Sequence, residues 1–162
     1  MTELPTFDNA QAWTGRVMAR RDDWIHDLNA AEVAEIDEAV QHAEATGRDI
    51  VDLRREDFPL GRLRPLLSRV KREALQGRGS FLIRGIPVDR YTLRQSATAY
   101  WGVGMYLGEA VSQNAKGHVL GHVANLRLDY ADPHVRRYQT NARLPYPPDM
   151  PHPLLLLCLH PP

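Results

Sequence analysis

The chain has 162 residues, a length that suits one domain of ordinary size and is short for two. Apolar residues make up 43% and charged residues 25%, which is typical of a globular protein rather than a disordered or fibrous one. The 20 basic and 20 acidic side chains cancel, so the sequence argues against a chain-wide basic surface for nucleic acid or for anionic membranes. A neutral chain also lacks the repulsion that keeps copies apart, which favours self-association.

The expected location is the cytoplasm. The single cysteine, Cys158, excludes an internal disulfide, so folding does not require an oxidising compartment. The first residues show no basic start followed by an apolar stretch, as a signal peptide would. The longest apolar run, 154–159, is far shorter than the roughly 20 residues that a membrane-spanning helix needs.

The first predicted element is a helix that follows an extension of mixed sequence over residues 1–28. Asn29 can accept a hydrogen bond from a free first-turn amide, and Glu32 stands three residues later, which is a capping-box arrangement. Apolar residues then recur at intervals of three and four, and Gly47 ends the pattern. The sequence therefore predicts a helix over 30–46.

Two further helices and one strand are predicted after residues 50–53, which suit either a short strand or a connection. A helix is expected over about 60–76, because leucines and a valine share one face with arginines opposite. The arginines of this region are interpreted as the solvated faces of helices, since acidic residues lie among them; they are Arg54, Arg55, Arg62, Arg64, Arg69 and Arg72. Residues 80–86 predict a buried strand between glycines and a proline, and a third helix is expected over about 92–108.

The arrangement of these elements indicates an α+β fold over residues 29–144, with further strand material at 118–130 and 140–146. Residues 145–162 hold seven of the twelve prolines around a block of leucines. Proline cannot donate to a strand ladder or to a helix interior, so we expect this Pro/Leu-rich tail to be irregular or poorly packed. The abrupt change in composition suggests an interrupted sequence, through a reading-frame slip or a degenerate gene end.

Few residues carry a recognisable chemical motif. His118 and His122 lie four residues apart, a spacing that suits two zinc ligands, but the glutamate of the HExxH pattern is missing. Surface or packing histidines are therefore favoured, with a zinc site as the alternative. The polar run SQNAKG over 112–117 could line a pocket or form an ordinary loop. Cys158 lies among leucines with no helix start to activate it, so we expect an inert, buried thiol.

A resemblance to a known family is carried by the strand GSFLIRGIP, by the helix that ends in LGEAVSQN, and by LPY with an acid three residues later. Over roughly residues 20–149, these features resemble the amino-terminal part of the TauD/TfdA-type dioxygenases. The resemblance implies iron(II)- and 2-oxoglutarate-dependent hydroxylation of a small molecule. It also implies a fold with the amino-terminal helices and first strands of a double-stranded β-helix, or jelly roll, and the whole of 1–162 is then a single domain with an incomplete barrel.

The metal-binding motif of that family is altered here. In the family, an H-x-[DE] motif after the LPY-like residues supplies two of three iron ligands, and a second His comes later. The resemblance places Asp149 at the carboxylate position, but Pro147 stands in place of the His and offers no ligand atom. The distal His and the arginine that binds 2-oxoglutarate have no counterpart in these residues. We therefore expect this chain to bind neither iron(II) nor 2-oxoglutarate and to be inactive.

Two further expectations concern ligands and partners. The alternative function is a non-catalytic α+β module that self-associates or binds a protein partner, since an incomplete barrel exposes strand edges and apolar faces. Nucleic acid and membranes are not expected as partners. If a small-molecule substrate pocket is retained, its polar lining is expected to come from Ser112, Gln113, Asn114 and Asn141.

Overall fold

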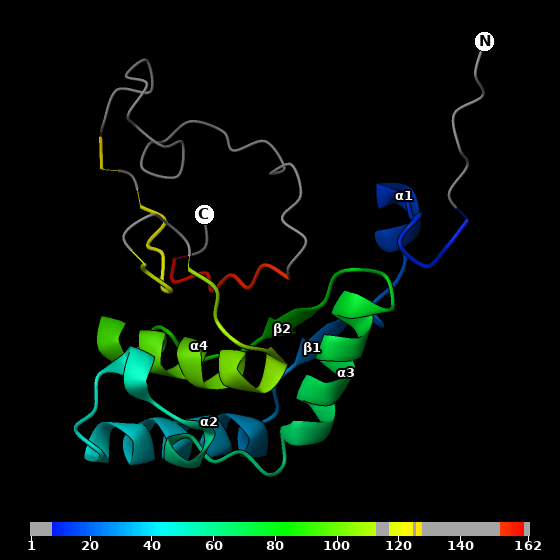
Figure 1. The fold of residues 1–162 in the computed structure, drawn as a ribbon. Helices are drawn as coiled ribbons and strands as arrows, with labels where there is room; N and C mark the ends of the chain where they lie inside the picture. The colour runs from blue at the N-terminus through cyan, green and yellow to red at the C-terminus, as the bar shows by residue number, and fades with distance from the viewer. Residues whose placement is uncertain (1–7, 113–116, 125, 128–152, 161–162) are drawn as a thin grey trace. The chain divides into compact units, whose positions relative to one another are not determined.

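The computed structural model of the chain describes residues 8–112, 117–124, 126–127 and 153–160 (Figure 1). They divide into two units, one containing the described residues up to Glu109 together with 155–160, the other the described residues of Ala110–Leu154. All described helices and strands belong to the first unit. In chain order they are α1 (Gly15–Met18), β1 (Ile25–Asp27), α2 (Ala30–Ala45), the short 3-10 helices η1 (Ile50–Asp52) and η2 (Arg55–Asp57), α3 (Arg64–Leu75), β2 (Leu82–Arg84) and α4 (Leu93–Leu107).

Helix α2 begins where the sequence predicts. The Asn29 side chain accepts hydrogen bonds from the amides of Ala31 and Glu32, both at 3.0 Å. The Glu32 carboxylate accepts in turn from the Asn29 amide at 2.9 Å, which completes the capping box. Helix α4 also begins with a capping box, in which Thr92 and Gln95 are the reciprocal pair. Both predicted helices are thus confirmed.

Helix α3 is shorter than predicted, because it starts at Arg64 rather than near residue 60. The cap residue, Leu63, has no side chain that can bond to the first-turn amides. A carboxylate from another helix holds this turn instead: Glu35 accepts hydrogen bonds from the amides of residues 61–63, at 2.8, 2.7 and 2.8 Å. Residues 50–52, left open between strand and connection, form η1.

The described sheet has two parallel strands, β1 and β2, with Ile25 opposite Leu82 and Asp27 opposite Arg84. The predicted strand over 80–86 is therefore shorter than expected, and it is only partly buried. It ends at Gly85, whose φ of +94° takes the backbone out of the extended region. Strand β1 was not predicted, because it lies in the extension of mixed sequence. The α+β class is confirmed, while the jelly-roll barrel stays a prediction.

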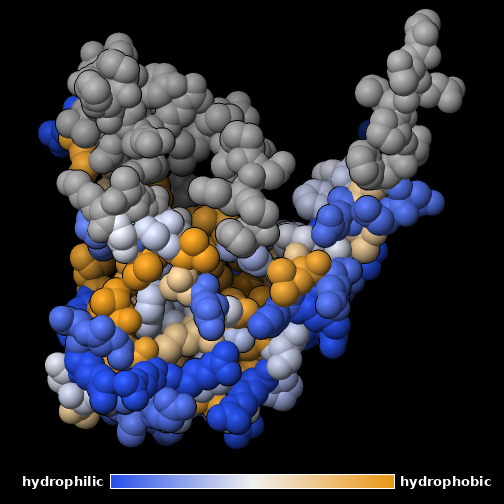
Figure 2. Space-filling model, in the orientation of Figure 1, coloured by the Kyte–Doolittle hydropathy of each residue, from blue (hydrophilic) through white to orange (hydrophobic). Residues whose placement is uncertain are grey.

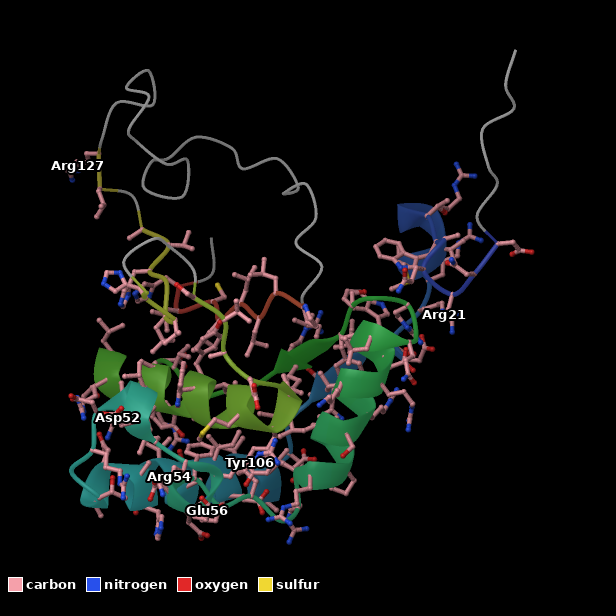
Figure 3. The ribbon with its side chains drawn as sticks, in the orientation of Figure 1. Arg21, Asp52, Arg54, Glu56, Tyr106 and Arg127 are labelled. Carbon is pink, nitrogen blue, oxygen red and sulfur yellow. The ribbon has the colours of Figure 1, made fainter. Side chains whose placement is uncertain are left out.

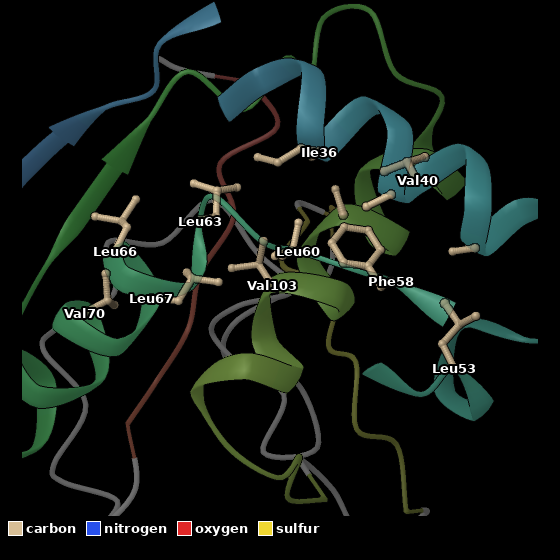
Figure 4. Close-up of a cluster of buried hydrophobic side chains, with 13 residues drawn as sticks. Ile36, Val40, Leu53, Phe58, Leu60, Leu63, Leu66, Leu67, Val70 and Val103 are labelled. Carbon is tan, nitrogen blue, oxygen red and sulfur yellow. The ribbon is translucent and has the colours of Figure 1, made fainter. Parts of the chain in front are cut away.

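The core of the first unit lies between α2, α3 and α4, and the ring of Phe58 is completely buried within it (Figure 4). The ring reaches α4 at Gly102, where a Cβ atom would lie 2.3 Å from Phe58 Cγ. Ile36 and Val40 cover the core from α2, and Val103 from α4. Figure 2 shows hydrophilic residues gathered along the outward side of α2, at the lower edge of the view.

The described segments 117–124 and 153–160 contain no helix or strand. The strand expected at 118–130 is therefore not found in its described part, whereas the one expected at 140–146 lies outside the described residues. Irregular structure at 153–160 agrees with the prediction for the proline-rich tail. Cys158 is exposed and not buried as expected. Two leucines of the same block are also exposed, at 62% for Leu154 and 72% for Leu156, whereas Leu157 and Leu159 on either side of the cysteine are half-buried. No described helix is long and apolar enough to cross a membrane.

Candidate functional site

The residues predicted to form a substrate pocket are not brought together by the described structure. Ser112 is exposed in the second unit. The other predicted positions lie outside the described residues; they are Gln113, Asn114, Asn141, Pro147 and Asp149. The predicted polar lining and the predicted carboxylate ligand therefore stay predictions.

An iron site is also not found in the described part of the chain. His118 and His122 are both exposed. Within the described ranges, no three His, Cys, Asp or Glu side chains gather closely enough to hold a metal ion. Since a facial triad needs two imidazoles and one carboxylate, the described residues do not fit the iron centre that the resemblance implies.

Charged side chains anchor β1 to the helices. Arg78 donates two hydrogen bonds to the Asp23 carboxylate, at 3.0 and 2.8 Å, and Arg21 donates two more. The hydrogen bonds from Arg78 and then Arg21 hold the pKa of Asp23 far below its ordinary value. On β1 itself, His26 Nε2 lies 3.1 Å from the Glu32 carboxylate. Burial raises the pKa of Glu32, but the Asn29 amide and His26 outweigh it and leave that pKa lowered.

Hydrogen bonds to Asp37 tie the loop before α4 to α2. The Tyr91 hydroxyl donates a short hydrogen bond to the Asp37 carboxylate, which also accepts from Arg90. Burial of the Tyr91 ring, followed by its bond to Asp37, raises the pKa of the phenol well above its ordinary value. A phenol that keeps its proton is a fixed donor, so this pair positions the loop.

The strongest candidate binding site in the described structure is a pocket of about 390 Å³ between η2, the start of α3 and the end of α4. Tyr106 lines this pocket, and its hydroxyl accepts from the Leu60 amide at 2.9 Å and donates to the Phe58 carbonyl at 3.0 Å. Both bonds lock the ring in one orientation. Glu56 lines the same pocket, and Figure 3 shows it close to Tyr106.

Two arginines flank the Tyr106 ring in this pocket. The guanidinium carbon of Arg55 lies 5.4 Å from the ring centroid and that of Arg64 lies 6.0 Å away, within the range of a cation–π contact. The sequence interpretation of these arginines as solvated helix faces is therefore incomplete. The signal that could have revealed them is weak, because it consists only of two arginines on either side of a Pro–Leu–Gly turn.

A second pocket, of about 300 Å³, is lined by Trp13, Arg21, Glu73, Arg78 and neighbouring residues. Its two arginines are already paired, since both bind Asp23 and Arg78 also binds Glu73 at 3.2 Å. The Trp13 indole donates to the Arg78 carbonyl at 2.8 Å. The arginines of this second pocket are therefore already paired with carboxylates of the protein.

The chain is similar to two curated proteins. It is 34% identical over 141 residues to FR-33289 synthase of Streptomyces rubellomurinus, a match that covers 84% of this chain and 40% of that protein. It is 25% identical over 159 residues to the taurine hydroxylase-like protein SAT17 of Stachybotrys chartarum, covering 94% of this chain and 41% of that protein. No family model matches the chain.

These matches confirm the resemblance to the TauD/TfdA-like dioxygenase family that the sequence predicts. The chain spans about 40% of the length of the curated relatives it matches.

Proposed function

We propose that this chain derives from an iron(II)- and 2-oxoglutarate-dependent oxygenase that hydroxylates a small molecule. The observation that carries the proposal is 34% identity to FR-33289 synthase across 84% of the chain. The second relative, a taurine hydroxylase-like protein, supports the same class of chemistry. Within such a protein, the unit built from α2, α3 and α4 serves as a helical scaffold, since its side chains pack inward around Phe58 and offer no cluster of metal ligands in the described residues.

We further propose that the 162 residues do not catalyse this reaction by themselves. Of the ligands that the family motif would supply, only Asp149 is present, because proline at position 147 has no atom that can bind a metal. One monodentate carboxylate gives little selectivity for iron(II) over solvent. Recognition of 2-oxoglutarate by paired hydrogen bonds also needs a fixed arginine, for which no residue of this chain matches the family position.

The test is the iron-dependent conversion of 2-oxoglutarate to succinate by the purified 162-residue protein. We expect no succinate above the level seen without protein, with or without small sulfonate, carboxylate or amino-acid substrates. Pro147→His restores only one ligand, so we expect it to leave the chain inactive. Turnover that requires both iron(II) and 2-oxoglutarate, and that disappears in Asp149→Ala, would refute the proposed inactivity.

A second candidate function is that of a self-associating module. The observation that favours it is the two-stranded sheet of the described residues, in which β1 and β2 each have only one partner. An unpaired strand edge is a template for pairing with another chain. Leu154 and Leu156 add exposed apolar surface to the same chain.

A further inference from the structure

The two arginines at the Tyr106 pocket are held in place by the backbone. Arg55 Nε donates to the Met105 carbonyl at 2.9 Å, and Arg64 Nε donates to the Leu60 carbonyl at 2.5 Å. Each guanidinium also lies against the Tyr106 ring, which is itself fixed by two hydrogen bonds. Their orientation is therefore largely set before any ligand arrives, which lowers the entropic cost of binding.

Their charges are not neutralised by the described protein. No carboxylate lies within ion-pair distance of Arg55 or Arg64 among the described residues, whereas Arg78 has two such partners. A guanidinium has five N–H donors, and each of these two uses only its Nε–H on a carbonyl. Both residues line the pocket of about 390 Å³, and their terminal nitrogens make no hydrogen bond or ion pair with the described residues.

We propose that this pocket binds a small tetrahedral oxyanion, of which inorganic phosphate is the simplest. Two separate guanidinium groups can each donate a pair of hydrogen bonds only if the ligand has acceptor oxygens on more than one side. A phosphate group provides them, whereas a carboxylate has two oxygens in one plane. Binding would also relieve the repulsion between two cations that lie against the same ring.

Two other residues of the pocket refine the ligand. The hydroxyl of Ser68 lies in the lining and can donate to a further oxygen. Glu56 lines the pocket as well, and its carboxylate opposes a fully ionised anion but can accept a hydrogen bond from one that keeps a proton. The site therefore favours hydrogen phosphate over sulfate. All these residues lie in the first unit, so the proposal does not depend on the iron chemistry of the family.

The test is calorimetric titration of the purified chain with phosphate at constant ionic strength, beside chloride, acetate and sulfate. We expect saturable binding of phosphate and weaker binding of the other three. Arg55→Gln and Arg64→Gln should each lower the affinity by about tenfold or more, since each removes charge-assisted hydrogen bonds to the anion. Arg55→Lys keeps the charge but loses the planar fork, so it too should bind more weakly than the unaltered chain.

The matched control is Arg62→Gln, which removes an exposed arginine from the same turn that does not line the pocket. It should leave the phosphate affinity unchanged. Circular dichroism and thermal unfolding of every variant establish that each one is folded. Absence of saturable phosphate binding by the unaltered chain, equal binding of acetate, or an equal loss in Arg62→Gln would overturn the proposal.

Discussion

Glycine at position 102 lets an aromatic ring lie directly against the backbone of α4. A Cβ atom there would meet three ring carbons of Phe58 at 2.3 to 2.5 Å, closer than any real contact. The ring is itself completely buried and cannot move aside without disturbing α2 and α4. A Cβ atom at Gly104, two residues later in the same helix, would meet only the Leu155 side chain among the described residues, at an ordinary distance of 3.6 Å.

The two glycines therefore predict opposite effects of the same substitution. Gly102→Ala should lower the free energy of unfolding by about 1–3 kcal/mol, because it overpacks the core. Gly104→Ala should leave that free energy unchanged or raise it by up to about 1 kcal/mol, because alanine favours the helix. Urea unfolding followed by circular dichroism measures both values. Equal effects of the two substitutions would show that Phe58 does not constrain position 102.

Asp23 predicts how stability responds to acid. Its pKa in the folded protein lies below the ordinary value of 3.8, because Arg78 and Arg21 bind the ionised form. A carboxyl group whose pKa is lowered by folding stabilises the folded protein at pH values above its ordinary pKa. This stabilisation is lost as the pH falls through the pKa of the group in the folded protein. Asp23→Asn should thus be less stable than the unaltered chain near neutral pH, and the gap should narrow below about pH 4.

Denaturant unfolding at several pH values between about 7 and 3 measures this gap. The control is Asp22→Asn, since the Asp22 side chain makes no hydrogen bond or ion pair in the described structure. It should show neither the difference at neutral pH nor its decline. A gap for Asp23→Asn that stays constant down to the acid end would mean that its carboxylate charge does not stabilise the fold.

At the scale of elements, the start of α3 is set by a side chain of α2. The Glu35 carboxylate accepts three backbone hydrogen bonds from the turn that enters α3, and no local side chain could replace it there. Glu35→Ala should lower the free energy of unfolding by about 1–3 kcal/mol, because it leaves these amides without a protein partner. Glu35→Gln should have a smaller effect, since its amide keeps one acceptor oxygen.

The matched control for this prediction is Glu38→Ala, an exposed glutamate on the same helix. This substitution also removes a glutamate carboxylate but leaves the turn before α3 unchanged. The free energy of unfolding should therefore change by no more than about 0.5 kcal/mol. Hydrogen exchange of the amides of residues 61–63 gives a second measurement, and it should accelerate in Glu35→Ala only. Unchanged exchange there would show that the turn is held by other contacts.

How well each element is predicted from the sequence depends on where its stabilising contacts lie. Helices α2 and α4 were located closely, because Asn29 with Glu32 and Thr92 with Gln95 are local signals. The start of α3 was misplaced because its cap comes from Glu35, 28 positions before Leu63. Strand β1 was missed because three residues carry no alternating pattern, and its partner is distant in sequence.

The candidate site was also hard to predict because its residues lie far apart in the sequence. In the sequence, Arg55 and Arg64 resemble ordinary surface arginines. In the structure, both lie against the ring of Tyr106, which comes from α4. The spacing of these residues along the chain gives no periodic signal that could have predicted this. The family resemblance, by contrast, follows a long run of sequence, and it is confirmed by relatives matched over most of the chain.

At the scale of the whole molecule, neutral charge, open strand edges and exposed leucines predict self-association. The purified chain should elute from a size-exclusion column as more than a monomer, increasingly so at higher concentration. Leu154→Glu combined with Leu156→Glu should shift it toward the monomer, because charges oppose apolar contact. Leu75→Glu, at an exposed leucine of α3, is the matched control. A monomer at every concentration would refute both the association and the second candidate function.

The parallel pairing of β1 with β2 has a consequence for biosynthesis. Strand β1 precedes α2 and α3 in the chain, whereas β2 follows them, so the ribosome releases β1 well before its partner exists. At about 5–20 residues per second, β1 waits for several seconds while the intervening helices emerge. During that interval the helices can form from local contacts, but closure of the sheet must overcome the entropy of a long loop.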